Sequence, residues 1–297
     1  MRIWLAIAKS IIKFLLPLPY KAKRVQGEIV LITGAGSGLG RLLATKFAKL
    51  GNTIILWDVN TSGNEETAAL VRKEGVKAHA YTVDLGSREA IYAAAAEVKR
   101  DVGHVTILVN NAGIVTGKKL LDASDELVKK TFDVNTVAHF WTVKTFLPHM
   151  LEQNHGHVVT IASSAGLVGV NGLVDYCASK FAAVGLDQSL RFELHASGKD
   201  GVHTTCVCPY FINTGMFGGV QVKFPNFCPV LEPDYAADKI MEAILTNQQM
   251  LIMPRVMYGL VAALALLPTE GHFHVADFLG TNRCMNSFKG HQDTRAM

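Results

Sequence analysis

The chain has 297 residues, of which 49% are hydrophobic and 18% are charged, and its formal net charge is +4. This length and apolar content allow one substantial core, of the size usual for a doubly wound fold. Six basic residues precede the first acidic residue, Glu28, so the body of the chain lacks the basic excess typical of nucleic-acid-binding proteins.

The first sixteen residues are apolar apart from Arg2, Lys9, Ser10 and Lys13. On a helix the three basic side chains form one narrow stripe, and the segment is shorter than the ~20 apolar residues that a spanning helix needs. We therefore expect an amphipathic helix in a membrane interface, or a short anchor. A cleaved signal peptide and a helix that packs on the body of the protein are the alternatives.

The body of the chain alternates short apolar strands with amphipathic helices. Strands are predicted at 28–32, 53–57, 77–82, 105–109, 157–162, 202–207 and 249–253. Helices are predicted near 38–50, 63–74, 87–102, 124–153, 175–197 and 233–247. This alternation predicts an α/β fold with a doubly wound, mostly parallel seven-stranded sheet of Rossmann type and helices on both faces. Ligands of such folds bind beyond the carboxyl ends of the strands.

The first strand is followed directly by the glycine-rich sequence TGAGSGLG at 33–40, and a helix begins there. Strand, glycine turn and helix N-terminus together bring free backbone N–H groups onto a pyrophosphate. A glycine-rich loop without a ligand is the alternative, but Asp58 argues against it. It ends the next strand, where a carboxylate binds the ribose hydroxyls of NAD and repels the 2′-phosphate of NADP. The candidate residues of the turn are Gly34, Ser37, Gly38, Leu39 and Gly40.

Tyr176 and Lys180 are spaced to lie on one face of a helix, and Ser163 precedes the tyrosine by thirteen residues. We expect the ammonium to depress the phenol pKa from its ordinary value near 10 towards neutrality. A tyrosine tuned in this way exchanges a proton with an alcohol or a carbonyl, and a serine hydroxyl beside it holds the substrate oxygen. A tyrosine and lysine at this spacing alone are common, so the prediction rests on their combination with the glycine turn.

The cysteines and histidines give no sign of a metal or disulfide site. The chain has five cysteines and no CxxC spacing, which favours reduced thiols. Cys206 and Cys208 alternate on a predicted strand and so share one face. The histidine pairs 155/157 and 272/274 lack companion ligands, so we interpret them as surface or packing residues.

The region from 210 to 231 has no helix or strand period and is rich in phenylalanine. Loops of this length in compact domains are usually functional, and its apolar content suggests that it covers a lipophilic substrate. A second apolar run, 256–267, is too short to span a membrane and could lie beside the N-terminal segment. We therefore divide the chain into a membrane-associating segment 1–25, a Rossmann-type domain 26–255 and an apolar C-terminal segment with tail 256–297.

Several motifs occur in the order and at the distances of one known family. They are TGAGSGLG at 33–40, Asp84, Asn110-Asn111-Ala112-Gly113, Asn135, Ser163, YCASK at 176–180 and Cys208-Pro209. With these motifs the chain resembles the short-chain dehydrogenase/reductase family over residues 27–250. Within it, the chain is similar to the membrane-associated branch that contains the retinol dehydrogenases and the 17-beta-hydroxysteroid dehydrogenases of lipid droplets.

The resemblance implies a role for each matching residue. Asp84 and Leu85 would lie near the adenine, and Asn135 would mark a kink whose backbone carbonyl holds a water next to Lys180. The family spacing favours Ser163 over Ser164 as the catalytic serine. The catalytic set is thus Asn135, Ser163, Tyr176 and Lys180, and Asn111, Ala112, Gly113, Tyr176, Lys180, Pro209 and Thr214 complete the cofactor site.

The function implied is oxidation of a lipophilic alcohol with NAD as cofactor, all-trans-retinol being the first candidate substrate. A steroid or long-chain alcohol is the second, and a non-enzymatic scaffold that binds the cofactor is the third. The resemblance further implies a homodimer. The apolar N-terminal segment, followed by Lys21, Lys23 and Arg24 that would meet anionic headgroups, predicts a location at the cytosolic face of the endoplasmic reticulum membrane or on lipid droplets. The charge distribution and the residue spacing predict no nucleic-acid partner and no metal.

Overall fold

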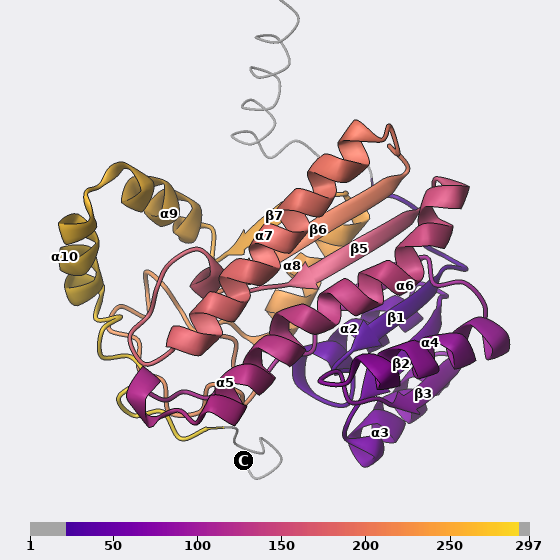
Figure 1. Ribbon diagram of the computed structural model, residues 1–297, viewed down its shortest axis with the longest axis horizontal. Helices are drawn as coiled ribbons and strands as arrows, with labels where there is room; N and C mark the ends of the chain where they lie inside the picture. The colour runs from indigo at the N-terminus through magenta and orange to yellow at the C-terminus, as the bar shows by residue number, and fades with distance from the viewer. Residues whose placement is uncertain (1–21, 291–297) are drawn as a thin grey trace, which may run out of the picture.

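The computed structural model describes residues 22–290 and contains one seven-stranded sheet (Figure 1). The strand order is β3-β2-β1-β4-β5-β6-β7, and every neighbouring pair is parallel. The strands are Ile29–Thr33 (β1), Thr53–Asp58 (β2), Ala78–Thr82 (β3), Ile107–Asn110 (β4), Gly156–Ile161 (β5), Val202–Pro209 (β6) and Met250–Met253 (β7). The predicted fold class is therefore confirmed, and the sheet is wholly parallel.

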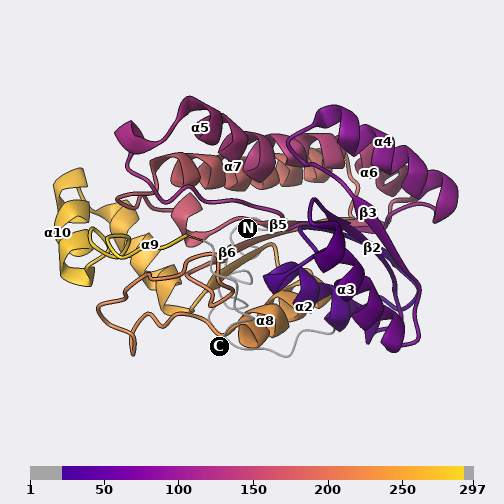
Figure 2. The same ribbon diagram turned by 90° about the horizontal axis from the view of Figure 1, so that it is seen from below.

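Helices cover both faces of this sheet, as Figure 2 shows from the side. One layer consists of Gly38–Ala48 (α2), Thr61–Lys73 (α3) and Pro233–Leu245 (α8). The other consists of Arg88–Asp101 (α4), Asp125–Phe132 (α5), Ala138–Gln153 (α6) and Val174–Ala196 (α7). Alternate side chains of each strand enter different cores: Ile32 packs in the α2 and α8 layer, and Leu31 packs in the α4 and α6 layer. Burial on both faces explains why these strands are almost continuously apolar.

The helix predicted at 124–153 is divided by a single π-helical turn, Asp133–Val137 (η2), between α5 and α6. π-Helical turns inside α-helices occur frequently at functional sites. Asn135, where the family resemblance implies a kink, lies in the middle of this turn.

The chain after the sheet forms two short helices that project from the body, Val256–Leu266 (α9) and Thr269–Leu279 (α10) (Figure 1). Met257 is the only residue of α9 that is fully buried, and α10 has none. Within residues 22–290 no helix combines the length and apolar character needed to cross a bilayer. The amphipathic helix predicted for residues 1–16 lies outside the described residues.

Candidate active site

The carboxyl ends of the strands face a cavity of about 730 Å³. It opens where the strand order reverses between β1 and β4, which is where ligands bind in open α/β sheets. All but one of the predicted site residues line it. They are Gly34, Ser37, Gly38, Leu39, Gly40, Asp58, Asp84, Leu85, Asn111, Ala112, Gly113, Ser163, Tyr176, Lys180, Pro209 and Thr214. The exception, Asn135, lies behind the cavity wall.

The glycine turn after β1 is packed so closely that two of its positions exclude a side chain. Gly34 has φ +64°, and a Cβ there would lie 2.8 Å from the Cα of Ala112. A Cβ on Gly40 would lie 2.1 Å from the Gly34 carbonyl oxygen. Ser37, the N-cap residue of α2, makes no side-chain capping bond. The first N–H groups of α2 are therefore not used by a side-chain cap, and they suit the pyrophosphate of a dinucleotide.

Asp58 is held at the end of β2 beside this turn. Its carboxylate accepts hydrogen bonds from the backbone N–H of Gly36 at 2.8 Å and of Asn60 at 2.8 Å. Two such bonds fix the orientation of the carboxylate at the edge of the cavity. The residues present therefore fit a dinucleotide cofactor whose adenosine ribose has free hydroxyls.

Asn111 joins the end of β4 to the glycine turn. Its side-chain Nδ2 donates to the carbonyl oxygens of Thr33 at 2.9 Å and Gly34 at 3.2 Å. Its backbone N–H donates to the Thr33 hydroxyl at 3.0 Å. These bonds link the two strands at which the order reverses, and so they hold the opening of the cavity.

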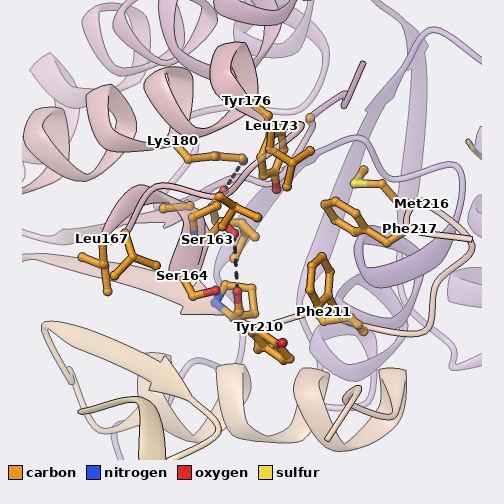
Figure 3. A pocket seen from close by; sticks show the side chains of 18 of the residues that line it. Ser163, Ser164, Leu167, Leu173, Tyr176, Lys180, Tyr210, Phe211, Met216 and Phe217 are labelled. Carbon is orange, nitrogen blue, oxygen red and sulfur yellow. Dashed lines mark hydrogen bonds between the residues drawn. The ribbon is translucent and has the colours of Figure 1, made fainter. Parts of the chain in front are cut away.

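Tyr176 and Lys180 extend from α7 toward Ser163, which follows β5, as Figure 3 shows. The Lys180 Nζ lies 5.7 Å from the centroid of the Tyr176 ring and donates to the Ile161 carbonyl oxygen at 2.9 Å. The Ser163 hydroxyl hydrogen-bonds the phenol and accepts from the Ala165 N–H at 3.1 Å. The three predicted groups thus meet at one point of the cavity.

Burial has the largest effect on the pKa values of Tyr176 and Lys180. It raises the pKa of Tyr176, against a smaller lowering by the Ser163 hydrogen bond, and it lowers the pKa of Lys180 to about 8. The expectation that Lys180 depresses the phenol pKa is therefore wrong for the protein without a ligand. Lys180 donates to a backbone carbonyl instead of the phenol, and desolvation disfavours the charged form of both side chains.

Asn135 holds the π-helical turn against the segment that follows β4. Its Oδ1 accepts from the Ile114 N–H at 2.8 Å, and its Nδ2 donates to the Ile114 carbonyl at 2.9 Å and to the Ser179 hydroxyl at 3.0 Å. A Cβ added to Gly113 would lie 3.4 Å from both the Asn135 Oδ1 and the Lys180 Nζ. Asn135 and Lys180 therefore both lie next to Gly113, although Asn135 does not line the cavity.

Aromatic side chains form the wall opposite Tyr176 (Figure 3). The Phe217 ring lies 5.7 Å from that of Tyr176 and 5.0 Å from that of Phe211, measured between centroids. Both phenylalanines belong to the loop predicted to cover the substrate, and Thr214 of the same loop lines the cavity. The C-terminal Phe288 supports Phe217 from behind, with 6.5 Å between their centroids.

Sequence reasoning missed part of the apolar lining. The loop between β5 and α7 contributes Leu167, Val168, Val170 and Leu173, and its run of apolar residues after Ser163 was a signal. The C-terminal segment contributes Thr281 and Cys284. Nothing in the local sequence of that segment indicates that it returns to the cavity.

Comparisons with known proteins agree with this geometry. The family profile described as short chain dehydrogenase matches residues 28–223. Epidermal retinol dehydrogenase 2 of Homo sapiens is 52% identical over 95% of this chain and 91% of that protein. Retinol dehydrogenase 10 of Homo sapiens is 47% identical over 90% of this chain and 86% of that protein.

A solved structure shows the same arrangement of elements. It is a short chain dehydrogenase/reductase from Burkholderia phymatum in complex with NAD, with a TM-score of 0.74 and 26% sequence identity. The likeness covers 93% of this chain and 100% of that one. The present chain belongs to the short chain dehydrogenase family.

Proposed function

We propose that the protein oxidises a lipophilic alcohol with NAD as hydride acceptor, and that all-trans-retinol, oxidised to retinal, is the leading substrate. The observation that carries this proposal is the position of Ser163, Tyr176 and Lys180, between the glycine cradle and an apolar cavity wall. The names of the two relatives above, both retinol dehydrogenases, support the same substrate class.

Each side chain of the site has a distinct task in this reaction. When bound, the nicotinamide cofactor supplies the acceptor for the hydride that leaves the carbinol carbon. The Tyr176 phenolate takes the hydroxyl proton and becomes the neutral phenol, and the Ser163 hydroxyl donates a hydrogen bond to the same substrate oxygen. The Lys180 ammonium stabilises the phenolate. General acid–base assistance of this kind accelerates reactions by roughly 10²–10⁴-fold.

The choice of NAD over NADP depends on Asp58. Replacing Asp58 with serine should shift the ratio of catalytic efficiencies toward NADP by about 10- to 100-fold, because a charge-assisted bond to the ribose and a charge repelling the 2′-phosphate are lost. The measurement is kcat/KM for both cofactors with one alcohol.

Asp84 provides the matched control, since it is also an aspartate at a strand end that lines the cavity. We expect Asp84→Ser to weaken both cofactors alike, because this side chain is proposed to lie near the adenine. Equal efficiencies of NAD and NADP with the unmodified enzyme would contradict the role of Asp58.

A steroid or a long-chain alcohol is the second substrate candidate. The distal part of the cavity is lined by α9 and α10, with Leu260, Leu264 and Leu279 among the lining residues. An elongated apolar molecule fits such a lining whether it is a retinoid, a steroid or a fatty alcohol. Turnover of retinol, estradiol and a long-chain alcohol with NAD on the membrane-bound protein distinguishes these classes.

We further propose that the hairpin of α9 and α10 lies in a membrane surface and admits the substrate from the lipid phase. The inner side of the hairpin lines the cavity, whereas Leu266, Phe273 and Phe278 are exposed, at 87%, 62% and 67%. The run 256–267 contains no charged residue. Together with segment 1–25, the hairpin would place the catalytic domain 26–255 on the cytosolic face of the endoplasmic reticulum or on lipid droplets.

The membrane proposal predicts that the hairpin of α9 and α10 and the segment 1–25 both contribute to membrane binding. Replacing Leu266, Phe273 and Phe278 with serine should release part of the protein from membranes, because each such side chain stabilises the bound state by about 1.5–3 kcal/mol when fully buried. Deleting residues 1–21 should do the same. The deletion stops before Lys23, whose Nζ lies 2.6 Å from the Nδ1 of His157 at the amino end of β5.

The measurement is the membrane-bound fraction after carbonate and salt washing. Phe192→Ser is the matched control, since Phe192 lies on α7 and is also 67% exposed. A protein that carries both changes and stays fully bound would contradict the proposal.

The homodimer implied by the family resemblance is likewise a proposal, which the mass of the solubilised protein tests.

A further inference from the structure

The segment that follows β4 forms one wall of the cavity, yet residues 111–117 have no regular secondary structure. Residues 111–114 line the cavity. A strand is held in place by the hydrogen bonds to its neighbours in the sheet, and this segment lies beyond the end of that ladder. Its position relative to Tyr176 therefore depends on hydrogen bonds made by individual side chains.

Asn135 makes the first attachment of this segment to α7. Its side chain bonds both the N–H and the carbonyl oxygen of Ile114. The same side chain donates to the Ser179 hydroxyl at 3.0 Å, and that hydroxyl donates to the backbone carbonyl oxygen of Tyr176 at 2.7 Å. Ile114 is thereby connected to α7 on the C-terminal side of Tyr176.

Thr116 makes the second attachment, on the N-terminal side of Tyr176. Its hydroxyl oxygen lies 2.9 and 2.7 Å from the two carboxylate oxygens of Asp175, so the one hydroxyl proton is shared between them. Asp175 belongs to the first turn of α7, where a negative charge is favoured by the helix dipole, and it is only 4% exposed.

The Asp175 carboxylate has no other side-chain partner that would hold it. None of the salt bridges in the described part of the chain involves Asp175. A buried polar group that loses its hydrogen-bond partner destabilises a protein by more than a typical hydrogen bond stabilises it. The bond between Thr116 and Asp175 is therefore costly to break, and it fixes the segment firmly on α7.

The residue between the two attachments packs against the catalytic tyrosine. Val115 lies on the apolar cluster that contains Tyr176, and Phe217 packs on the same cluster. The backbone is fixed on one side of Val115 at Ile114 and on the other at Thr116. The two attachments therefore determine how the segment rests on Tyr176.

This arrangement matters for the reaction because the other end of the segment belongs to the cofactor site. Asn111 donates to the carbonyl oxygens of Thr33 and Gly34 in the glycine turn. Transfer of a proton to Tyr176 and of a hydride to the cofactor requires both partners in one geometry around the alcohol. A misplacement of about 1 Å can cost about 10²-fold in rate.

We propose that Thr116 and Asp175 are positioning residues, which hold Tyr176 at the correct distance from the cofactor side of the cavity. Neither residue lines the cavity, so both act through Tyr176 and not by contact with the reacting atoms. This inference rests on the proposed function, because the rate that it concerns is the rate of alcohol oxidation.

The first test removes the hydroxyl of Thr116 and keeps its shape. In the full chain, Thr116→Val should lower the single-turnover rate of NADH formation by about tenfold, a barrier increase of about 1.4 kcal/mol. The rate is measured at saturating NAD and alcohol and is expressed per molecule that binds NADH. The KM for NAD should be unchanged, because Asn111 keeps its bonds to the glycine turn. Thr116→Ser keeps the hydroxyl and should react at nearly the unmodified rate.

A double variant separates positioning from stability. Thr116→Val alone leaves a buried carboxylate without its donor, so the melting temperature should fall. Replacing both polar partners with apolar groups of similar shape can be nearly neutral for stability. Thr116→Val combined with Asp175→Leu should therefore regain much of the melting temperature, while the single-turnover rate stays low. A rate that recovers together with the melting temperature would show a purely structural contact and overturn the proposal.

Thr131→Val is the matched control, because Thr131 is fully buried and its hydroxyl donates within its own helix, to the Leu127 carbonyl oxygen at 2.9 Å. It should lower the melting temperature without changing the rate per NADH-binding molecule. An unchanged rate in Thr116→Val would overturn the proposal.

If Thr116→Val does not fold, Asp175→Asn takes its place, because the amide keeps one acceptor oxygen for Thr116 but loses the charge that strengthens the bond. Asp175→Asn should then be slowed, and an unmodified rate would overturn the proposal. The proposed function fails by a different result, since an unmodified enzyme that oxidises no alcohol contradicts it directly.

Discussion

Replacing Tyr176 with phenylalanine should lower kcat/KM for alcohol oxidation by about 10²–10⁴-fold, the usual contribution of a general acid–base group. The substitution removes the phenol oxygen and keeps the ring. The ring is buried and packs edge-on against Phe217, so the core around it is retained. We therefore expect a melting temperature close to that of the unmodified protein.

The experiment compares initial rates of NAD reduction at saturating cofactor. Tyr210→Phe is the matched control, because Tyr210 also lines the cavity, whereas it is the Tyr176 ring that lies 5.7 Å from the Lys180 Nζ. Ser163→Ala should be nearly as damaging and Ser164→Ala much milder. A Tyr176→Phe enzyme with near-normal turnover would show that another group accepts the proton, and the opposite order of the serines would move the role to Ser164.

Much of the fold could be predicted because burial on both faces leaves a clear mark in the sequence. Strands such as β1 and β2 are short apolar runs, and each ends in a polar residue at the carboxyl edge of the sheet. The glycine turn could be predicted for a related reason, since its backbone excludes any Cβ at Gly34 and Gly40. Local constraints of this kind are visible in single residues.

The remaining features depend on contacts between distant parts of the chain. The π-helical turn at Asn135 has nearly the same hydrophobic period as the α-helices around it, so only the resemblance indicated it. The direction of the Tyr176 pKa shift depends on how deeply the ring is buried, which a spacing of four residues does not report. The packing of Phe288 against Gly117, where a Cβ would lie 2.0 Å from the ring, joins segments that are far apart in sequence.

Replacing Lys180 with methionine should abolish most of the activity and nevertheless stabilise the ligand-free protein at neutral pH. Burial lowers the pKa of Lys180 from 10.5 to about 8. The folded state therefore binds this proton more weakly than the unfolded state, and below pH 8 the buried charge opposes folding. The corresponding free energy is at most about 3 kcal/mol, reduced by about 1 kcal/mol for the lost hydrogen bond to the Ile161 carbonyl.

The sign of the effect gives a pH dependence. The gain in the free energy of unfolding should be full below pH 8, decline as the pH rises, and vanish near pH 10.5, where the unfolded lysine also loses its proton. Chemical denaturation of both proteins across this range measures it.

Lys46→Met is the control with the opposite expectation, because its hydrogen bond with Asp238 raises the pKa of Lys46. A Lys180→Met protein that is less stable at every pH would mean that the interactions of the Lys180 ammonium outweigh the cost of its desolvation. If that protein also retained turnover, the proposed stabilisation of the phenolate would be wrong as well. Loss of activity together with a gain in stability would show that the protein keeps a buried, costly charge because its chemistry requires it.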